Sequence, residues 1–223
     1  MALCFADVHI ERKQVRRMYL KVNRDGTVSM TVPLCLNEKA VQAFFEEKKQ
    51  WTEKVLRHMP AVPHFSYSQG EKHFFMGHPV FLIYHRGTCG SCRIDGTQVI
   101  LTLPVRGADS QRLIRECWKK ALYEQLQLSV SRWESVMGIR SAGFSIRAMK
   151  TRWGTCNLLT GRLCFALELS SMPVSCIDYV VLHELTHLLE AGHTPRFHAI
   201  MSWYMPDWKE KKQILNESPR EFT

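Results

Sequence analysis

The stretch Val180-Val-Leu-His-Glu-Leu-Thr-His-Leu-Leu-Glu-Ala-Gly-His193 decides how the rest of the chain is interpreted. Two of its histidines, His183 and His187, stand four positions apart, so on a helix they lie on one face about one turn from each other. Such a pair suits a zinc ion, and Glu184, beside the first histidine, is placed to act on metal-bound water. The pattern therefore predicts a metal-binding helix.

A third histidine, His193, follows this helix. We expect the helix to run to about Glu190, after which Gly192 is the residue that can take a left-handed turn. That turn would fold His193 back toward the ion. Three neutral imidazoles and a water complete a four-coordinate zinc shell with one open position, as in catalytic sites. The sequence thus predicts one metal ion per chain, Zn²⁺ or alternatively another divalent transition metal, held by His183, His187 and His193.

A zinc ion at this place would make the chain a metal-assisted hydrolase. Zinc lowers the pKa of its bound water toward about 7, and Glu184 can accept the proton as general base. A carbonyl or phosphoryl oxygen on the ion would be polarised at the same time. The alternative is an ordinary helix without metal, but unpaired histidines are costly to bury on so apolar a helix.

The composition is that of a soluble globular protein. The 223 residues fit one domain or two small lobes, and no run approaches the roughly 18 apolar residues that a membrane helix needs. Asp7 and Glu11 interrupt the N-terminus before a signal-peptide core develops, so we expect a cytoplasmic protein with reduced cysteines. The net charge of +9 permits binding to nucleic acid, nucleotides or acidic substrates and specifies none of them.

Residues 1–107 are predicted to form a β-rich lobe with one helix. Alternating apolar residues on either side of Asn23–Gly26 predict a hairpin, and Asn37 can cap the helix. The Gly-rich stretch between Cys89 and Gly96 is predicted to be a loop, and its close pair Cys89 and Cys92 to be reduced thiols rather than an accessory metal or redox site. The predicted elements are strands at 15–22, 27–33, 72–76, 79–84 and 98–103 and a helix at 38–58.

Residues 108–223 are predicted to form the metallohydrolase lobe, with the active-site helix packed on a small β-sheet. The fold class is therefore α+β, and we expect the two lobes to make one continuous structural unit. The predicted elements are a helix at 108–137 with a possible break near 129–131, strands at 143–149 and 162–169, the metal helix from Pro173 to about Glu190, and helices at 194–204 and 206–216.

Several motifs of this half together resemble the YgjP-like metallopeptidase family. They are Arg152-Trp-Gly-Thr-Cys156, the strand Leu163–Leu169, Ile177-Asp-Tyr-Val-Val-Leu-His-Glu-Leu-Thr-His187, His193-Thr-Pro-Arg-Phe197 and Met205-Pro-Asp207. The resemblance implies a zincin-like α+β fold, a metal held by His183, His187 and His193, and Glu184 as a catalytic residue. Some members of the family are described as metallopeptidases and others as metal-dependent pyrophosphatases acting on UTP.

Outside the metal motif, Arg152 is the best candidate for a catalytic cation. It precedes the strand that leads into the metal helix and could stabilise an oxyanion or a phosphate, although a buried salt bridge with Asp178 is an equal alternative. Arg196 is open to the same two interpretations. His198 stands where the family usually has tryptophan, and it is either a residue near the ligands or substrate, or a surface substitution.

Three functions remain open from the sequence. The first is a zinc metallopeptidase, whose peptide substrate could add to the Leu163–Leu169 strand if that strand is an exposed edge. The second is a nucleoside triphosphate pyrophosphatase, favoured by the positive charge, although the chain has no Walker-type glycine loop and no carboxylate cluster for magnesium. The third is a nucleic-acid-associated protein with a structural metal, which an open three-histidine shell argues against.

Overall fold

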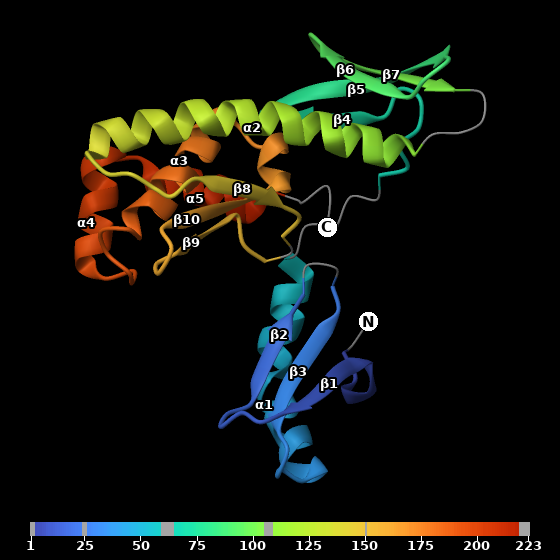
Figure 1. Ribbon diagram of the computed structural model, residues 1–223. Coiled ribbons are helices and arrows are strands. Elements are labelled where there is room, and N and C mark those ends of the chain that lie inside the picture. The colour runs from blue at the N-terminus through green and yellow to red at the C-terminus, as the bar shows by residue number, and fades with distance from the viewer. Residues whose placement is uncertain (1–2, 24–25, 59–64, 105–108, 150, 219–223) are drawn as a thin grey trace. The chain divides into compact units, whose positions relative to one another are not determined.

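The computed structural model describes residues 3–23, 26–58, 65–104, 109–149 and 151–218 (Figure 1). It is a mixed α+β protein with several small sheets and five helices in the described part of the chain. The chain divides into two compact units, residues 1–62 and residues 63–223. None of the described helices combines the length and the apolar character that crossing a membrane requires.

The N-terminal unit packs one helix against a three-stranded sheet. The predicted hairpin is present as the antiparallel pair β2–β3, but the structure adds β1, which runs parallel to β3 at the other edge. Asn37 caps α1 as predicted, because its Oδ1 accepts a hydrogen bond from the Ala40 amide at 2.9 Å. The elements are the 3₁₀ helix η1 (Phe5–Asp7), β1 (Val8–Lys13), β2 (Tyr19–Val22), β3 (Val28–Pro33) and α1 (Glu38–His58).

The described residues of the C-terminal unit form two sheets and four α-helices. The four-stranded sheet has the order β4-β5-β7-β6 and the three-stranded sheet the order β8-β10-β9. The long helix α2 lies against the first sheet at one end and against α3 at the other (Figure 1). The elements are β4 (Lys72–Phe75), β5 (His78–Gly87), β6 (Ser91–Asp95), β7 (Gln98–Pro104), α2 (Ser110–Met137), β8 (Phe144–Arg147), β9 (Gly154–Asn157), β10 (Arg162–Ala166), η2 (Leu167–Ser171), α3 (Val174–Thr186), α4 (Pro195–Tyr204) and α5 (Trp208–Glu217).

The division between the units differs from the predicted one. Leu82 and Leu101 of the four-stranded sheet share one hydrophobic core with Trp118 of α2. The turn between β4 and β5 also donates two backbone hydrogen bonds to η2, from Met76 to Ser170 at 2.7 Å and from Gly77 to Ser171 at 3.1 Å. The first sheet therefore supports the C-terminal elements. The sequence predicted lobes 1–107 and 108–223 in one continuous unit, whereas the compact units of the structure divide after residue 62.

The structure differs from the predicted elements of this unit in three further places. The strand predicted to reach Leu169 ends at Ala166, because the hydroxyls of Ser170 and Ser171 bond to the carbonyls three residues earlier and hold a 3₁₀ turn. The stretch predicted as a loop before Gly96 contains β6, which pairs with β7. The possible break in α2 is absent, because the Ser129 hydroxyl bonds to Asp178 rather than to its own helix backbone.

Candidate active site

The helix α3 carries the first two histidines of the site. Its apolar residues Val181, Leu182 and Leu185 are fully buried in the core, and α2 packs along it. His183 and His187 lie on the remaining face with ring centroids 5.0 Å apart. The helix ends earlier than predicted, because i→i+3 hydrogen bonds tighten the chain into turns from residue 185 to residue 190.

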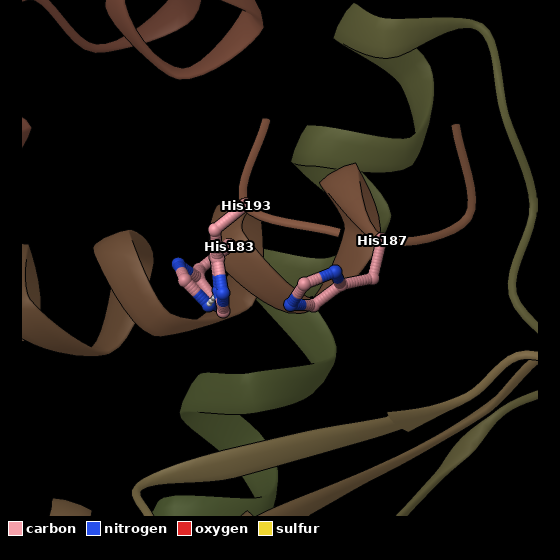
Figure 2. A group of neighbouring side chains, drawn as sticks. All are labelled: His183, His187 and His193. Carbon is pink, nitrogen blue, oxygen red and sulfur yellow. Dashed lines mark hydrogen bonds between the residues drawn. The ribbon is translucent and has the colours of Figure 1, made fainter. Parts of the chain in front are cut away.

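The chain after α3 brings His193 back to the same point (Figure 2). The Nε2 atoms of His193 and His183 are 3.0 Å apart, and one nitrogen of each of the three histidines lies within 4.8 Å of the others. Tetrahedral zinc with Zn–N bonds of about 2.0–2.1 Å places its ligand nitrogens about 3.3 Å apart. The three imidazoles therefore fit one zinc ion without a change in the chain path.

The chain does not return through the left-handed turn that was predicted at Gly192. Gly192 has no positive φ, and the turns that follow α3 reverse the chain before it. His193 is instead held from the other side, where α4 begins. Thr194 caps that helix by accepting a hydrogen bond from the Phe197 amide at 3.3 Å, and Pro195 occupies the first helical turn.

Two groups orient the imidazoles. The Nδ1 atom of His187 lies 3.3 Å from the carbonyl oxygen of Glu190, so an Nδ1–H donor leaves Nε2 free for a metal. The ring of Phe197 lies 4.8 to 4.9 Å from each of the three imidazole rings and is buried. Phe197 makes the apolar floor of the site. The sequence reasoning missed this role, although the residue stands in the His193–Phe197 motif.

Burial favours the neutral form of His183. It lowers the pKa of His183 to about 3, and the nearby His187 and His193 lower it further by charge repulsion. Burial also lowers the pKa of His193, to which His187 adds. A neutral imidazole is the form that binds metal, so both pKa shifts favour the form of His183 and His193 that could hold an ion.

Glu184 is held between the helix and the sheet. Its side chain is 5% exposed, and burial raises its pKa to about 8, against an opposing effect of the Arg152 charge. A Cβ atom on Gly154 of β9 would stand 2.7 Å from Glu184 Oε1 and 2.8 Å from its Cγ. Only glycine at position 154 leaves this space. The carboxylate therefore occupies a slot formed by the backbone of β9.

A cavity of about 540 Å³ opens beside these groups. Its lining includes the segment from Arg152 to Cys156, whose last three residues belong to β9, and Lys212 and Leu215 of α5. Arg152 thus lies in the lining of this cavity. Asp178, the alternative partner considered for it, pairs with Arg132 of α2 at 2.6 Å.

The other candidate residues of the sequence lie outside this cavity lining. Arg196 is largely exposed and pairs with Glu190 at 3.9 Å. His198 stacks on Trp208 with a centroid distance of 5.4 Å and an angle of 7°, so it packs behind the site. In the part of the chain that the structure describes, the three histidines are the only group of His, Cys, Asp and Glu residues arranged to hold a metal. Cys92 of the Cys89–Cys92 pair instead contacts Cys117 of α2.

Solved structures are similar to part of this chain, whereas no curated protein matches it. The crystal structure of the metallopeptidase zymogen abylysin from Pyrococcus abyssi is similar over 44% of this chain and 99% of its own, with 17% identity and a TM-score of 0.39. That of the zymogen jannalysin from Methanocaldococcus jannaschii is similar over 41% and 93%, with 18% identity and a TM-score of 0.38.

The match by family is independent of these two structures. The family model described as YgjP-like, metallopeptidase domain, matches residues 16–218. This range includes all three histidines of the site, the glutamate in its slot and the β9 motif. It confirms the resemblance drawn from the motifs: the chain belongs to the YgjP-like, metallopeptidase domain family.

Proposed function

We propose that the protein is a zinc-dependent peptidase-like hydrolase with a zincin-like arrangement, in which Glu184 is the general base and Arg152 a catalytic cation. The observation that carries the proposal is the convergence of His183, His187 and His193 beside a buried glutamate at the edge of a cavity. Zinc bound there would supply a Lewis acid and an acidified water. All further steps fall to side chains of the chain.

Glu184 has the properties of a group that both accepts and returns a proton. Burial raises its pKa to about 8 in the metal-free protein. The charge of a bound cation would lower this pKa again, toward the range in which a carboxylate can accept a proton at neutral pH. Glu184 would take the proton of the attacking water and pass it to the leaving nitrogen of the peptide. Arg152 lies in the lining of the same cavity and would stabilise negative charge that develops on the substrate.

The sheet favours an extended peptide as substrate. β10, suggested from the sequence as the edge strand, lies in the middle of its sheet with β8 and β9 on either side. Among the described strands, β9 pairs with β10 alone, and Gly154, Thr155 and Cys156 of β9 line the cavity. An extended peptide can add to such an edge by backbone hydrogen bonds. β9 therefore replaces β10 as the proposed binding strand.

A nucleotide substrate is the second candidate, supported by two cations. Arg152 and Lys212 both line the cavity, and they would attract phosphates. Against this candidate, the described residues contain no carboxylate cluster for magnesium, the metal that usually accompanies nucleoside triphosphates. The third candidate, a structural metal in a nucleic-acid-associated protein, does not account for a glutamate in a slot beside an accessible metal position.

One parallel assay separates these candidates. Zinc-loaded protein and the variant Glu184→Gln are incubated with a fluorogenic peptide mixture and, separately, with the four nucleoside triphosphates. We expect cleavage of peptides by the wild-type protein and none by the variant. Release of pyrophosphate that depends on Glu184 would establish the nucleotide candidate instead, and no reaction with either substrate set would leave the structural-metal candidate.

A further inference from the structure

The residue one turn before the first metal ligand also faces the site. Tyr179 precedes His183 by four positions on α3, so it lies on the same helix face as His183 and His187. Its ring centroid is 5.8 Å from that of His183, and it lines the same cavity. The phenol also lies within electrostatic reach of the Glu184 carboxylate. Neither the metal nor the general base requires this residue.

The ring of Tyr179 is fixed from behind by a column of aromatic side chains. Trp208 of α5 stacks on it with a centroid distance of 6.5 Å and an angle of 5°, and His198 of α4 in turn stacks on the indole of Trp208. The indole is itself anchored, because Trp208 Nε1 donates a hydrogen bond to Ser202 Oγ at 3.0 Å. Three helices therefore hold the phenol in one orientation.

The hydroxyl of Tyr179 is open to the cavity. The residue is only 6% exposed. Its hydroxyl oxygen is nevertheless not one of the fully buried side-chain oxygens and nitrogens that lack a hydrogen-bond partner among the described residues. Among the residues that the structure describes, this hydroxyl has no hydrogen-bond partner. A buried tyrosine usually satisfies its hydroxyl within the protein. Here the free donor points to a ligand that binds in the cavity.

We propose that Tyr179 donates a hydrogen bond to the oxygen of the scissile carbonyl as it becomes an oxyanion, and is thus a further catalytic residue. The inference rests on the proposed function. No proton leaves Tyr179, because Glu184 transfers the proton from water to the leaving nitrogen, and an ordinary phenol with a pKa of about 10 stays protonated at neutral pH. A donor held in place before the reaction stabilises such a charge without the cost of reorganising it.

The test compares Tyr179→Phe with the control Tyr123→Phe. The first variant removes the hydroxyl and keeps the stacked ring. The second removes the hydroxyl of an exposed tyrosine of α2 that packs on Phe144, away from the cavity lining. For zinc-loaded protein we expect kcat on the fluorogenic peptides to fall about 10²-fold in Tyr179→Phe, with zinc content and melting temperature unchanged. Tyr123→Phe should match the wild type.

A second readout does not depend on turnover. Acetohydroxamate places oxygens on zinc, and calorimetry measures its affinity for each zinc-loaded protein. We expect Tyr179→Phe to bind it about tenfold more weakly than the wild type and Tyr123→Phe. Equal affinity and equal kcat in all three proteins would overturn the inference, as would loss of zinc from Tyr179→Phe, which would show a structural role. A wild-type protein that binds neither zinc nor acetohydroxamate would refute the proposed function itself.

Discussion

Replacing Gly154 with alanine tests whether β9 positions the general base. The new Cβ would stand 2.7 Å from Glu184 Oε1, whereas ordinary contacts begin at 3.4 Å, so the carboxylate must move by about 0.7 Å. β9 cannot retreat easily, because Gly154 is in register with Phe165 of the central strand. The helix cannot retreat either, because its opposite face is fully buried. The carboxylate is therefore the part that yields.

The expected loss follows from that displacement. A misplacement of about 1 Å in a catalytic group costs about 10²-fold in rate, which corresponds to about 2.7 kcal/mol of transition-state stabilisation. We expect Gly154→Ala to lower kcat by this factor on the fluorogenic peptides. Its zinc content should equal that of the wild type, because the three atoms nearest to the new methyl group all belong to Glu184 and none to a histidine.

Two further proteins make the result specific. Gly192→Ala is the matched control, because its Cβ would meet Thr194 at an ordinary 3.6 Å and its φ is not positive, so it should keep full activity. In a Glu184→Gln background, Gly154→Ala should cause no further loss, because both changes act through one group. Wild-type kcat in Gly154→Ala would refute the slot, and loss of zinc would show that the methyl group displaces α3 instead.

Two other predictions concern stability and the third ligand. Burial raises the pKa of Glu184 from 4.5 to about 8 in the metal-free protein, so this group makes folding less favourable as the pH rises from about 4.5 to about 8. In urea titrations of metal-free protein, the wild type should lose up to roughly 5 kcal/mol of unfolding free energy relative to Glu184→Gln across that range. A difference between the two proteins that is constant with pH would contradict this prediction. Thr194→Ala removes the cap of α4 next to His193 and should cost about 1 kcal/mol of unfolding free energy. It should also weaken zinc binding, measured by competition with a chelator. An unchanged zinc affinity would show that the cap does not hold His193 in place.

Local patterns predicted most of the helices correctly. The predicted helix at 38–58 matches α1 at both ends, and the long helix ends at Gly138 in the left-handed conformation expected of a glycine there. These features depend on residues a few positions apart. The parallel pairing of β1 with β3, and the central place of β10 in its sheet, depend on contacts between distant segments. No local pattern encodes them.

The same distinction holds at the site. The spacing of His183 and His187 predicted their common face, because helix geometry alone decides it. The space that Gly154 leaves for Glu184 appears only when β9 packs on α3. The floor made by Phe197 likewise appears only when α4 packs under the ligands.

The central claim is that three histidines hold a metal and that Glu184 performs the chemistry without holding it. Zinc content and peptide hydrolysis measured on the same preparations test it most directly. We expect about one zinc per chain and activity in the wild type, about one zinc and no activity in Glu184→Gln, and loss of most of the zinc in His187→Ala. An active, zinc-loaded Glu184→Gln protein, or equal zinc content in His187→Ala and the wild type, would contradict the claim.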